Sequence, residues 1–425
     1  MKNRMKVGGD KKKMKKKIAI LVGIAACVML LTSPALASAG YSKIYGNANE
    51  DDVLDMRDVT YIKLVIFGKK PATTLADANY DGKISMLDVG QTKLIILGKE
   101  KRLTLKDQAD RTVTVPRPIE RVVTTFPSVT RAILVVDGLD RLVGVSSVLT
   151  KYSDKMLCLQ AYPELKELPT VGMHTNPNAE LILALKPDVV FSWATSADVL
   201  QENTGIPVIT ITTPSYFDEG SWESYRLAGK VLGKEEEVEE LISYANEKIE
   251  EITEVTSQIP EDEKPKVYFV SCCRGICEIT KTWGRYAPGD LAGGINVAKE
   301  QVISSGSSVV SKEQIIDWNP DIILLHGGSK TEAWGLSIED ILADTDLQSV
   351  NAVKNKDVYY TKGYMIGWDP ATGLTETFYM AKIFHPDKFK DLDVEKECNG
   401  ILKRFYGAGG LYTWLLENYD FRRWD

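Results

Sequence analysis

ELILALKPDVVFSW, residues 180–193, contains the end of an apolar helix, a Lys-Pro-Asp break and a run of β-branched and aromatic residues. Proline cannot donate the backbone hydrogen bond that would continue the helix, so the break separates two elements. The run that follows is short and continuously apolar, which is typical of a strand buried inside a parallel sheet. Residues 314–328, QIIDWNPDIILLHGG, repeat this order of helix, Pro-Asp break and buried strand. The repeated unit predicts an α/β fold with helices on the faces of a sheet.

Further strand signals surround both copies. They are a hairpin or edge segment at 103–118 and the apolar runs IERVVTTF (119–126), RLVGVSS (141–147), TGIPVITIT (204–212), KVYFVS (266–271) and DVYYT (357–361). We therefore expect a parallel sheet in each half of the chain. Between the halves, residues 235–257 contain neither Gly nor Pro and place apolar residues three and four positions apart, as in one amphipathic helix.

Two α/β halves joined by one long helix predict a bilobed molecule, and a bilobed molecule forms a cleft. We expect Rossmann-like lobes at residues 105–225 and 264–425, with the connecting helix inside residues 226–263. A chain of 425 residues has room for these domains and for a small one before them.

The first 39 residues have the three-part layout of a secretory signal peptide. A basic segment precedes 14 apolar residues (18–31), and small residues then offer cleavage sites after Ala37 or Ala39. The apolar run is shorter than the about 20 residues that a membrane-spanning helix needs. An uncleaved anchor and acylation of Cys27 are the alternatives. The sequence thus predicts an exported protein.

Export changes the charge of the chain. The leader holds nine Lys or Arg residues and one acid, so removing its net +8 from the formal −7 of the whole chain leaves the remainder near −15. Such a surface repels nucleic acid and anionic lipid, which excludes nucleic acid as an expected partner.

Five cysteines follow the leader, an odd number: Cys158, Cys272, Cys273, Cys277 and Cys398. Three of them lie in SCCRGIC, residues 271–277. A disulfide between Cys273 and Cys277 is one interpretation of this cluster, and thiolate ligation of a soft metal is the other.

Residues 47–58, NANEDDVLDMRD, and residues 77–88, DANYDGKISMLD, are two copies of a polar loop before an amphipathic helix. Between residues 47–69 and 77–99, 11 of 23 aligned positions are identical, which indicates a duplication. Calcium prefers about six to eight oxygen ligands, and such a loop supplies them at alternating positions with a closing carboxylate. The expected ligands are Asn47, Asn49, Asp51, the backbone of Val53, Asp55 and Asp58 in the first loop, and Asp77, Asn79, Asp81, the backbone of Lys83, Ser85 and Asp88 in the second.

Asp52 stands where the second loop has Gly82, so we expect a strained turn and weaker calcium binding in the first loop. The alternative is that both loops are Asn/Asp-rich turns that only start helices. Residues 41–104 resemble the dockerin module, a calcium-dependent plug that inserts into cohesin domains. The resemblance implies a small all-α domain with cohesin-facing residues near Arg57–Asp58 and Leu87–Asp88.

Three segments, RVVTTFPSVTRAILVVDGLDRLVGVSS (121–147), LPTVGMHTNPNAELILALKPDVVFSW (168–193) and SKEQIIDWNPDIILLHGG (311–328), resemble the substrate-binding proteins of ABC importers. The resemblance is to the group that carries iron–siderophore complexes, haem and cobalamin, and it extends over about residues 105–425. It implies two lobes joined by a single long helix, and an ABC permease with its ATPase as partners.

The same resemblance implies one acidic residue on each lobe that meets a basic pocket of the permease. The matching positions are Glu180 and Glu313, each at the start of a helix before a Pro-Asp break. The alternative is that each carboxylate only stabilises its helix N-terminus, an effect of about 0.3–1 kcal/mol.

Ligands of open α/β sheets bind at the carboxyl ends of strands. This rule selects residues that follow the predicted strands of both halves: Phe126, His174, Trp193, Trp283, Arg285, Tyr286, His326, Tyr364 and Trp368. The aromatic side chains would pack a large planar or macrocyclic chelate, and Arg285 would clamp its oxyanions. His174 and His326 are candidate metal ligands, because neutral imidazole suits iron, nickel and cobalt, whereas His385 is expected to be structural.

We therefore expect an exported, monomeric, non-enzymatic receptor that captures an iron chelate of the siderophore type and delivers it to a permease. A corrinoid, haem or nickel complex is the alternative cargo. An extracellular hydrolase on a dockerin would need facing carboxylates, for which the sequence offers Asp290 and Asp369. The calcium module would tether the receptor to the cell surface or to a scaffold.

Overall fold

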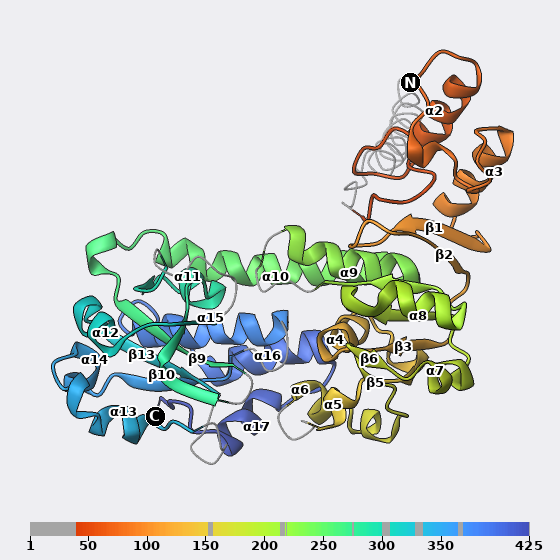
Figure 1. Ribbon diagram of the computed structural model, residues 1–425. Coiled ribbons are helices and arrows are strands. Elements are labelled where there is room, and N and C mark those ends of the chain that lie inside the picture. The colour runs from red at the N-terminus through yellow and green to blue at the C-terminus, as the bar shows by residue number, and fades with distance from the viewer. Residues whose placement is uncertain are drawn as a thin grey trace, which may run out of the picture.

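The computed structural model describes residues 40–151, 156–212, 217, 219–273, 276–299, 307–327, 335–363 and 369–424. A small helical module stands at one corner of the molecule, above a β-hairpin that leads into two α/β lobes (Figure 1). Within the described part of the chain, no helix combines the length and apolar character needed to cross a membrane. The leader expected at residues 1–39 lies outside the described residues.

The N-terminal module contains two helices of equal length, α2 (Met56–Ile66) and α3 (Met86–Ile96). Each begins with a capping box, in which the N-cap side chain and an Asp three residues later accept each other's backbone N–H groups. A small core of Ala48, Val59, Ile62, Ala76 and Val89 holds the module together. The duplication in the sequence thus produces two equivalent helix starts.

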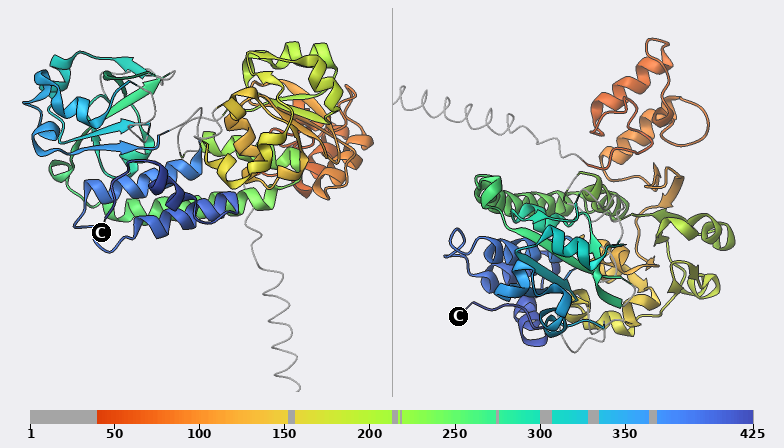
Figure 2. Two further views of the ribbon diagram at one scale, coloured as in Figure 1. Left: turned by 90° about the horizontal axis from the view of Figure 1, so that it is seen from below. Right: turned by 60° about the vertical axis from the view of Figure 1, so that its left-hand side comes forward.

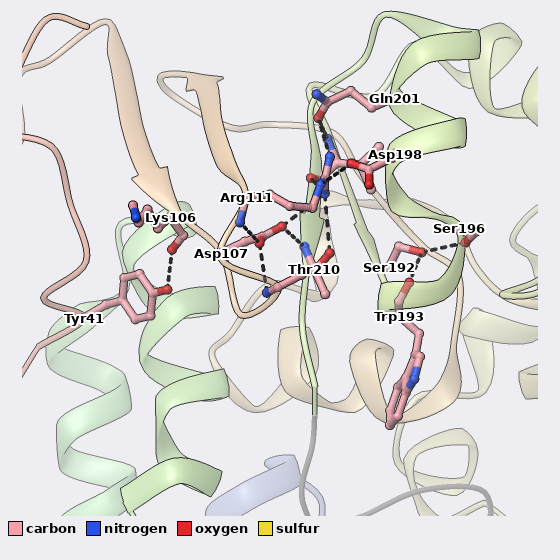
Figure 3. Close-up of polar contacts among 12 residues, drawn as sticks. Tyr41, Lys106, Asp107, Arg111, Ser192, Trp193, Ser196, Asp198, Gln201 and Thr210 are labelled. Carbon is pink, nitrogen blue, oxygen red and sulfur yellow. Dashed lines mark hydrogen bonds and ion pairs between the residues drawn. The ribbon is translucent and has the colours of Figure 1, made fainter. Parts of the chain in front are cut away.

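The expected hairpin forms from β1 (Arg102–Lys106) and β2 (Thr112–Pro116). At its turn the fully buried carboxylate of Asp107 pairs with Arg111 at 3.1 Å and accepts the backbone N–H of Thr210 at 2.9 Å. Arg111 Nε in turn donates to Asp198 at 2.6 Å (Figure 3). Because Thr210 and Asp198 belong to the first lobe, the hairpin is fixed to the edge of that lobe.

The sheet of the first lobe has the order β4-β3-β7-β8, and every neighbouring pair is parallel, as predicted. Its strands are β3 (Val122–Thr124), β4 (Leu142–Gly144), β7 (Val189–Ser192) and β8 (Val208–Thr210). The helices around it are α4 (Pro127–Val135), α5 (Ser147–Lys151), α6 (Leu157–Ala161), α7 (Ala179–Leu185), α8 (Ala197–Thr204) and α9 (Glu219–Leu232). A two-residue turn joins the short strands β5 (Gly172–Met173) and β6 (Asn176–Pro177).

The second lobe has a mixed sheet of six strands, in which β10 and β12 are antiparallel to their neighbours. Its strands are β9 (Lys266–Cys273), β10 (Ile276–Trp283), β11 (Ile295–Asn296), β12 (Ser307–Val309), β13 (Ile322–His326) and β14 (Val358–Thr361). Its short helices are α11 (Ala287–Leu291), α12 (Lys312–Trp318), α13 (Ile338–Ala343) and α14 (Asn351–Asn355). The second sheet departs from the expected parallel arrangement at β10, because the chain turns back after β9 as a hairpin; β9, β11, β13 and β14 pair in parallel, as expected.

One long helix, α10 (Glu235–Thr256), connects the two lobes where the sequence predicts it. Three helices follow the second sheet: α15 (Pro370–Phe384), α16 (Val394–Tyr406) and α17 (Leu411–Asn418). Every residue of α15 is buried, α15 packs on α10, and α16 and α17 contact α4 and α6 of the first lobe. The C-terminal helices run beside α10 along one side of the molecule (Figure 2), so the connection between the lobes is broader than a single helix.

Candidate functional site

Three half-buried rings meet at the carboxyl end of the first sheet, and we call Phe126, His174 and Trp193 the first-lobe cluster. Phe126 follows β3 as the N-cap of α4, Trp193 follows β7, and His174 lies in the β5–β6 turn. The ring centroid of Phe126 lies 4.7 Å from that of His174 and 5.2 Å from that of Trp193, both in edge contact. The strand-end rule thus selected three residues that the fold brings together.

The surroundings of His174 favour the neutral form of its imidazole. Burial lowers its pKa below the ordinary value of 6.5. Its Nδ1 atom is buried and has no hydrogen-bond partner within the described part of the chain. Burying a polar nitrogen without a hydrogen bond costs free energy. A ligand group that forms a hydrogen bond or a metal contact with this atom would remove that cost.

Buried hydroxyl groups hold the backbone that carries Trp193. Ser192 Oγ lies 2.8 Å from Thr125 Oγ1 and 3.4 Å from Ser196 Oγ. It also donates to the carbonyl oxygen of Trp193 at 3.2 Å. In Figure 3 the indole of Trp193 extends away from Ser192 and Ser196, so these hydrogen bonds fix the backbone and leave the ring free for contact.

Three further rings, Trp283, Tyr286 and His326, form the second-lobe cluster. Trp283 ends β10 and stacks on Tyr286 with 5.6 Å between centroids and 4° between planes. His326 ends β13, and its ring centroid lies 4.7 Å from that of Trp283. Tyr286 and His326 are only 1% and 3% exposed, whereas Trp283 is half-buried, so a ligand at this face meets Trp283 before the other two.

His326 is also neutral. Burial, together with the nearby charge of Lys362, lowers the pKa of its imidazole to about 3. Its ring packs directly on the backbone of Gly363, where an added Cβ would lie 2.3 Å from the ring atoms. Each lobe therefore presents a neutral imidazole against an aromatic ring at a centroid distance of 4.7 Å.

Other predicted site residues are placed differently. Arg285 and the nearby Asp290 are both exposed. Partial desolvation of the Asp290 carboxyl raises its pKa, and the charges of Lys299 and Arg285 oppose this shift. Asp369, one of the two carboxylates considered for a hydrolase, is a buried N-cap of α15 that accepts hydrogen bonds from Thr372 and Tyr406. His385 is structural, with Nε2 at 3.2 Å from the carbonyl oxygen of Gly293. Tyr364 and Trp368 lie outside the described residues.

The three cysteines whose side chains the structure describes are of two kinds. Cys277 is disulfide-bonded and buried, and its sulfur lies 3.6 Å from the carbonyl oxygen of His326, next to the second-lobe cluster. A disulfide sulfur carries no thiolate charge, so the hypothesis that Cys277 ligates a soft metal is wrong. Cys158 and Cys398 are free thiols inside the core, and burial raises the pKa of both.

Glu180 and Glu313 occupy equivalent, exposed positions in the two lobes. Each lies in the first turn of a seven-residue helix, α7 or α12, capped by the side chain of Asn178 or Ser311. Each helix ends in a left-handed residue, Lys186 or Asn319. An aspartate follows the proline in each lobe. Asp188 accepts a hydrogen bond from the backbone N–H of Arg121, just before β3, and Asp321 accepts one from the backbone N–H of Lys266, at the start of β9. The structure therefore repeats one local design in both lobes.

The two polar loops of the module make the same internal contacts. Asn49 N and Asn79 N each donate to the closing Asp at 3.1 Å, and Asp55 N and Ser85 N donate to its other oxygen at 2.8 and 2.7 Å. Asp51 and Asp81 accept the backbone N–H of Val53 and Lys83 at 2.9 Å. The first position differs: Asp77 accepts from Asp81 N and Gly82 N, whereas Asn47 donates to the carbonyl oxygens of Ser42 and Asp51.

Gly82 has a positive φ of 86°, as expected for a sharp turn. Asp52 is not among the positive-φ residues of the described chain, so the expected strain at this position is wrong and the first loop turns by another path. Burial raises the pKa of the closing Asp58, and this effect outweighs the hydrogen bonds from Asp55 N and Asn49 N, which lower the pKa. Across the described residues, no three His, Cys, Asp or Glu side chains converge closely enough to hold a metal ion.

A buried acid that sequence analysis missed lies behind the second-lobe cluster. Glu376 on α15 is 4% exposed and accepts hydrogen bonds from Lys362 N at 3.0 Å and from the Tyr286 hydroxyl at 3.3 Å. Its signal in the sequence is a single acidic residue within PATGLTETFYMA, residues 370–381. Nothing in that pattern tells which ring the carboxylate meets, because Tyr286 is 90 positions away.

Comparison with known proteins identifies the body of the chain. Residues 122–365 match the family model described as periplasmic binding protein. The molybdate-binding protein MolA of Haemophilus influenzae is 28% identical over 327 residues, which cover 71% of this chain and 90% of MolA. An uncharacterised ABC transporter substrate-binding lipoprotein of Bacillus subtilis, YvrC, is 24% identical over 67% of this chain and 86% of its own length.

Solved structures show the same fold. A periplasmic solute-binding protein from Veillonella parvula superimposes with a TM-score of 0.60 and 24% identity, covering 72% of this chain and 94% of its own. MolA bound to molybdate superimposes with a TM-score of 0.59 and 24% identity, covering 72% of this chain and 98% of its own.

Proposed function

The chain belongs to the periplasmic binding protein family, and from this premise we propose that it is an exported receptor of an ABC importer that captures an iron chelate of the siderophore type. The relatives whose names state a role are binding proteins of transport systems, which supports capture without chemical change of the cargo. The receptor then delivers the chelate to a permease that is driven by its ATPase.

The observation that carries this proposal is the matched pair of clusters. Each lobe places a neutral imidazole against an aromatic ring at the carboxyl end of its sheet, in the Phe126–His174 and Trp283–His326 pairs. Aromatic faces bury large planar surfaces, which suits the rings of a catecholate or macrocyclic chelate. A neutral imidazole nitrogen is an acceptable ligand for iron, nickel or cobalt. A corrinoid, haem or nickel complex therefore remains the alternative cargo in the same class.

A small oxyanion is a second candidate, and one relative favours it. MolA is by name molybdate-binding. Tetrahedral oxyanions require several N–H or O–H donors, and the hydroxyl groups of Thr125, Ser192 and Ser196 lie next to Trp193. These hydroxyls already bond to one another and to the Trp193 carbonyl, so they favour this cargo less than the half-buried rings of Phe126, Trp193 and Trp283 favour a chelate.

Delivery to the permease is assigned to Glu180 and Glu313. Both carboxylates are exposed and lie on helix starts of identical design in the two lobes. A matched pair of negative charges can register both lobes at once on basic pockets of a two-subunit permease. Helix stabilisation alone explains one such acid but gives no reason for the equivalence.

The N-terminal module is assigned to calcium-dependent attachment, as in dockerins. Support comes from the equal contacts of the two loops and from the closing carboxylates Asp58 and Asp88, which are fully buried. In this proposal the oxygen atoms of each loop, with the closing Asp58 or Asp88, would hold a Ca²⁺ ion. A cohesin-like domain on the cell surface or on a scaffold is the partner that the proposal names.

Native mass spectrometry of the receptor purified from its source tests the cargo. We expect a bound ferric chelate with a visible absorption band, while a molybdate adduct would support the oxyanion candidate. Titration with a ferric tris(catecholate), haemin, cyanocobalamin, a nickel–histidine complex and molybdate, followed by tryptophan fluorescence, ranks the classes. His174→Ala should shift the absorption band of the bound complex if imidazole coordinates the metal, and His385→Ala is the control. Absence of binding to all five probes would contradict the receptor proposal.

A further inference from the structure

We infer that Glu376 is a positioning residue of the ligand site, which fixes the Trp283–His326 pair of the second lobe through Tyr286 and through the Lys362–Gly363 backbone. The inference rests on the proposed function of the second-lobe cluster. It concerns how that cluster keeps its shape.

One carboxylate holds two separate supports. Its Oε1 atom accepts the backbone N–H of Lys362 at 3.0 Å, and the backbone N–H of Gly363 also bonds to this carboxylate. Its Oε2 atom accepts the hydroxyl of Tyr286 at 3.3 Å. Glu376 lies on the fully buried helix α15, which packs against α11, the helix capped by Tyr286. The carboxylate therefore ties the start of α11 to the end of β14.

Each support carries one ring of the pair. Tyr286 lies parallel to Trp283 and forms the surface on which the indole rests. Gly363 forms the surface under His326, at a distance that leaves no space even for a Cβ atom. Displacing either support would move a ring, so the 4.7 Å contact of Trp283 with His326 depends on both bonds of Glu376. Gly363 also precedes the predicted ligand residue Tyr364 directly in the chain.

The charge state of Glu376 gives a readout of this role. Burial raises the pKa of its carboxyl to about 7, against the hydrogen bonds from Lys362, Gly363 and Tyr286 and the charge of Lys362. All three of these bonds point toward the carboxylate, so protonation of Oε2 reverses the bond with Tyr286, whose hydroxyl oxygen then accepts the acid O–H, and it removes the negative charge beside the Tyr286–Trp283 stack.

Few groups around Glu376 change charge near neutral pH. Burial raises the pKa values of Tyr379 on α15, Cys398 on α16 and Tyr412 on α17, and it lowers that of His326 on β13. Lys362 places its ammonium on the Tyr419 ring at 4.1 Å and on the Tyr419 hydroxyl at 3.0 Å. A change at Trp283 with a midpoint near pH 7 would therefore report on Glu376.

The first test needs no ligand. The Trp283 contribution to fluorescence is taken as the difference between each protein and the same protein carrying Trp283→Phe, from pH 5.5 to 8.5. We expect a step with a midpoint near 7 in the wild type. Glu376→Gln should abolish the step and keep the geometry, because its carbonyl accepts the two backbone N–H groups and its amide donates to the Tyr286 oxygen.

The second test measures affinity for a ferric tris(catecholate) complex by equilibrium dialysis at pH 8. Glu376→Leu should weaken binding about tenfold, the loss expected when one aromatic contact is displaced, while Glu376→Gln should bind like the wild type. Leu374→Ala, another buried change on α15, is the control for general destabilisation and should leave affinity unchanged. If Glu376→Leu fails to fold, Tyr286→Phe replaces it, because this variant removes one hydrogen bond and keeps the ring.

The outcomes separate this inference from the proposed function. A step that persists in Glu376→Gln, or wild-type affinity together with an unchanged Trp283 signal in Glu376→Leu or Tyr286→Phe, would overturn the role of Glu376. Absence of binding by the wild-type protein would count against the ferric chelate as cargo. The fluorescence step would in that case still decide whether Glu376 positions Trp283.

Discussion

Arg117 and Glu100 form a buried ion pair, with 2.9 Å between Nε and Oε1, where the N-terminal module meets the first lobe. The guanidinium also donates to the carbonyl oxygens of Lys230 and Val231 at the end of α9, at 3.0 and 2.6 Å. The core of the lobe continues into the module through Tyr41, Ile44 and Ile95. The module is thus packed onto the receptor, and a partner bound to it would be held at a fixed orientation to both lobes.

Breaking this ion pair should loosen the junction. Arg117→Ala should lower the free energy of unfolding by about 3 kcal/mol, because removing one partner of a buried pair leaves the other charge unpaired. The measurement is urea unfolding of the full chain. Lys43→Ala is the control, since Lys43 and Glu223 form a pair that is 48% and 33% exposed and such a pair contributes about 0–1 kcal/mol. Equal effects of the two changes would show that the junction does not depend on Arg117.

Calcium binding and helix capping make different predictions for the closing aspartates. Asp88→Asn keeps an acceptor oxygen for only one of the two backbone N–H groups, that of Asn79 or that of Ser85, and removes the negative charge that calcium requires. In wild-type protein, calcium should raise the melting temperature and EGTA should reverse the rise. Asp88→Asn should lower the melting temperature in EGTA through the lost hydrogen bond and should, in addition, reduce the rise that calcium produces; a purely capping role predicts the first effect without the second.

The first loop serves as a comparison. Asp58→Asn should remove less of the calcium response, because Asn47 replaces the charged Asp77 at the first position. A melting temperature that does not respond to calcium, with heat of binding absent in calorimetry, would leave Asp58 and Asp88 as capping residues only.

Charge reversal at both docking positions should separate delivery from capture. Glu180→Lys combined with Glu313→Lys should abolish cargo uptake by cells that depend on this receptor, because both permease pockets then meet like charges. Affinity for the cargo should not change, since both residues lie on exposed helix starts. Glu250→Lys, on the exposed side of α10, is the matched control. Reduced affinity in the double variant would mean that the two acids support the fold of the lobes.

The residues of the first-lobe cluster can be predicted from the sequence because they follow recognisable buried strands. Phe126 and Trp193 each follow a short, continuously apolar run, and the rule that parallel strands end at one edge then places them together without further knowledge. His174 follows from the same reasoning, because the segment before NPNAE returns to that edge. The repeated Pro-Asp unit likewise predicts both the parallel first sheet and the equivalence of Glu180 and Glu313.

The site residues of the second lobe are harder to predict from the sequence, because their geometry depends on tertiary contacts. The antiparallel strand β10 changes the direction in which Trp283 leaves the sheet, and ICEITKTW was not recognised as a strand. The strand-end rule places Tyr286 among the ligand contacts, whereas in the structure it is 1% exposed, stacks with Trp283 and donates to an acid from α15. Periodicity within one segment does not encode a partner 90 residues away.

Removing aromatic surface should weaken capture. Trp193→Ala and Trp283→Ala should each lower affinity for the cargo about tenfold or more, because each indole loses its whole contact area. Trp414→Phe on α17, which keeps an aromatic ring in contact with Tyr419, is the control and should bind like the wild type. Affinities are compared by equilibrium dialysis, since both variants change the fluorescence signal. Unchanged affinity in both variants would exclude the two clusters as the ligand site.

Two buried groups give the stability of the protein opposite pH dependences. The pKa of Glu376 is raised from 4.5 to about 7, so the native state holds this proton more tightly than the unfolded chain. Stability from this group is present below pH 4.5 and is lost as the pH rises through 7. The pKa of His326 is lowered from 6.5 to about 3, so its contribution is lost as the pH falls from 6.5 toward 3.

Comparison of Glu376→Gln with the wild type isolates the first of these effects, because His326 is present in both proteins. The free energy of unfolding of the wild type should fall relative to that of Glu376→Gln by about 3 kcal/mol between pH 4.5 and pH 7.5, since one unit of pKa shift corresponds to about 1.4 kcal/mol. Urea unfolding at several pH values in this window measures the difference. Parallel curves would show that Glu376 does not titrate inside the folded lobe, and the pH step expected at Trp283 would then have no source.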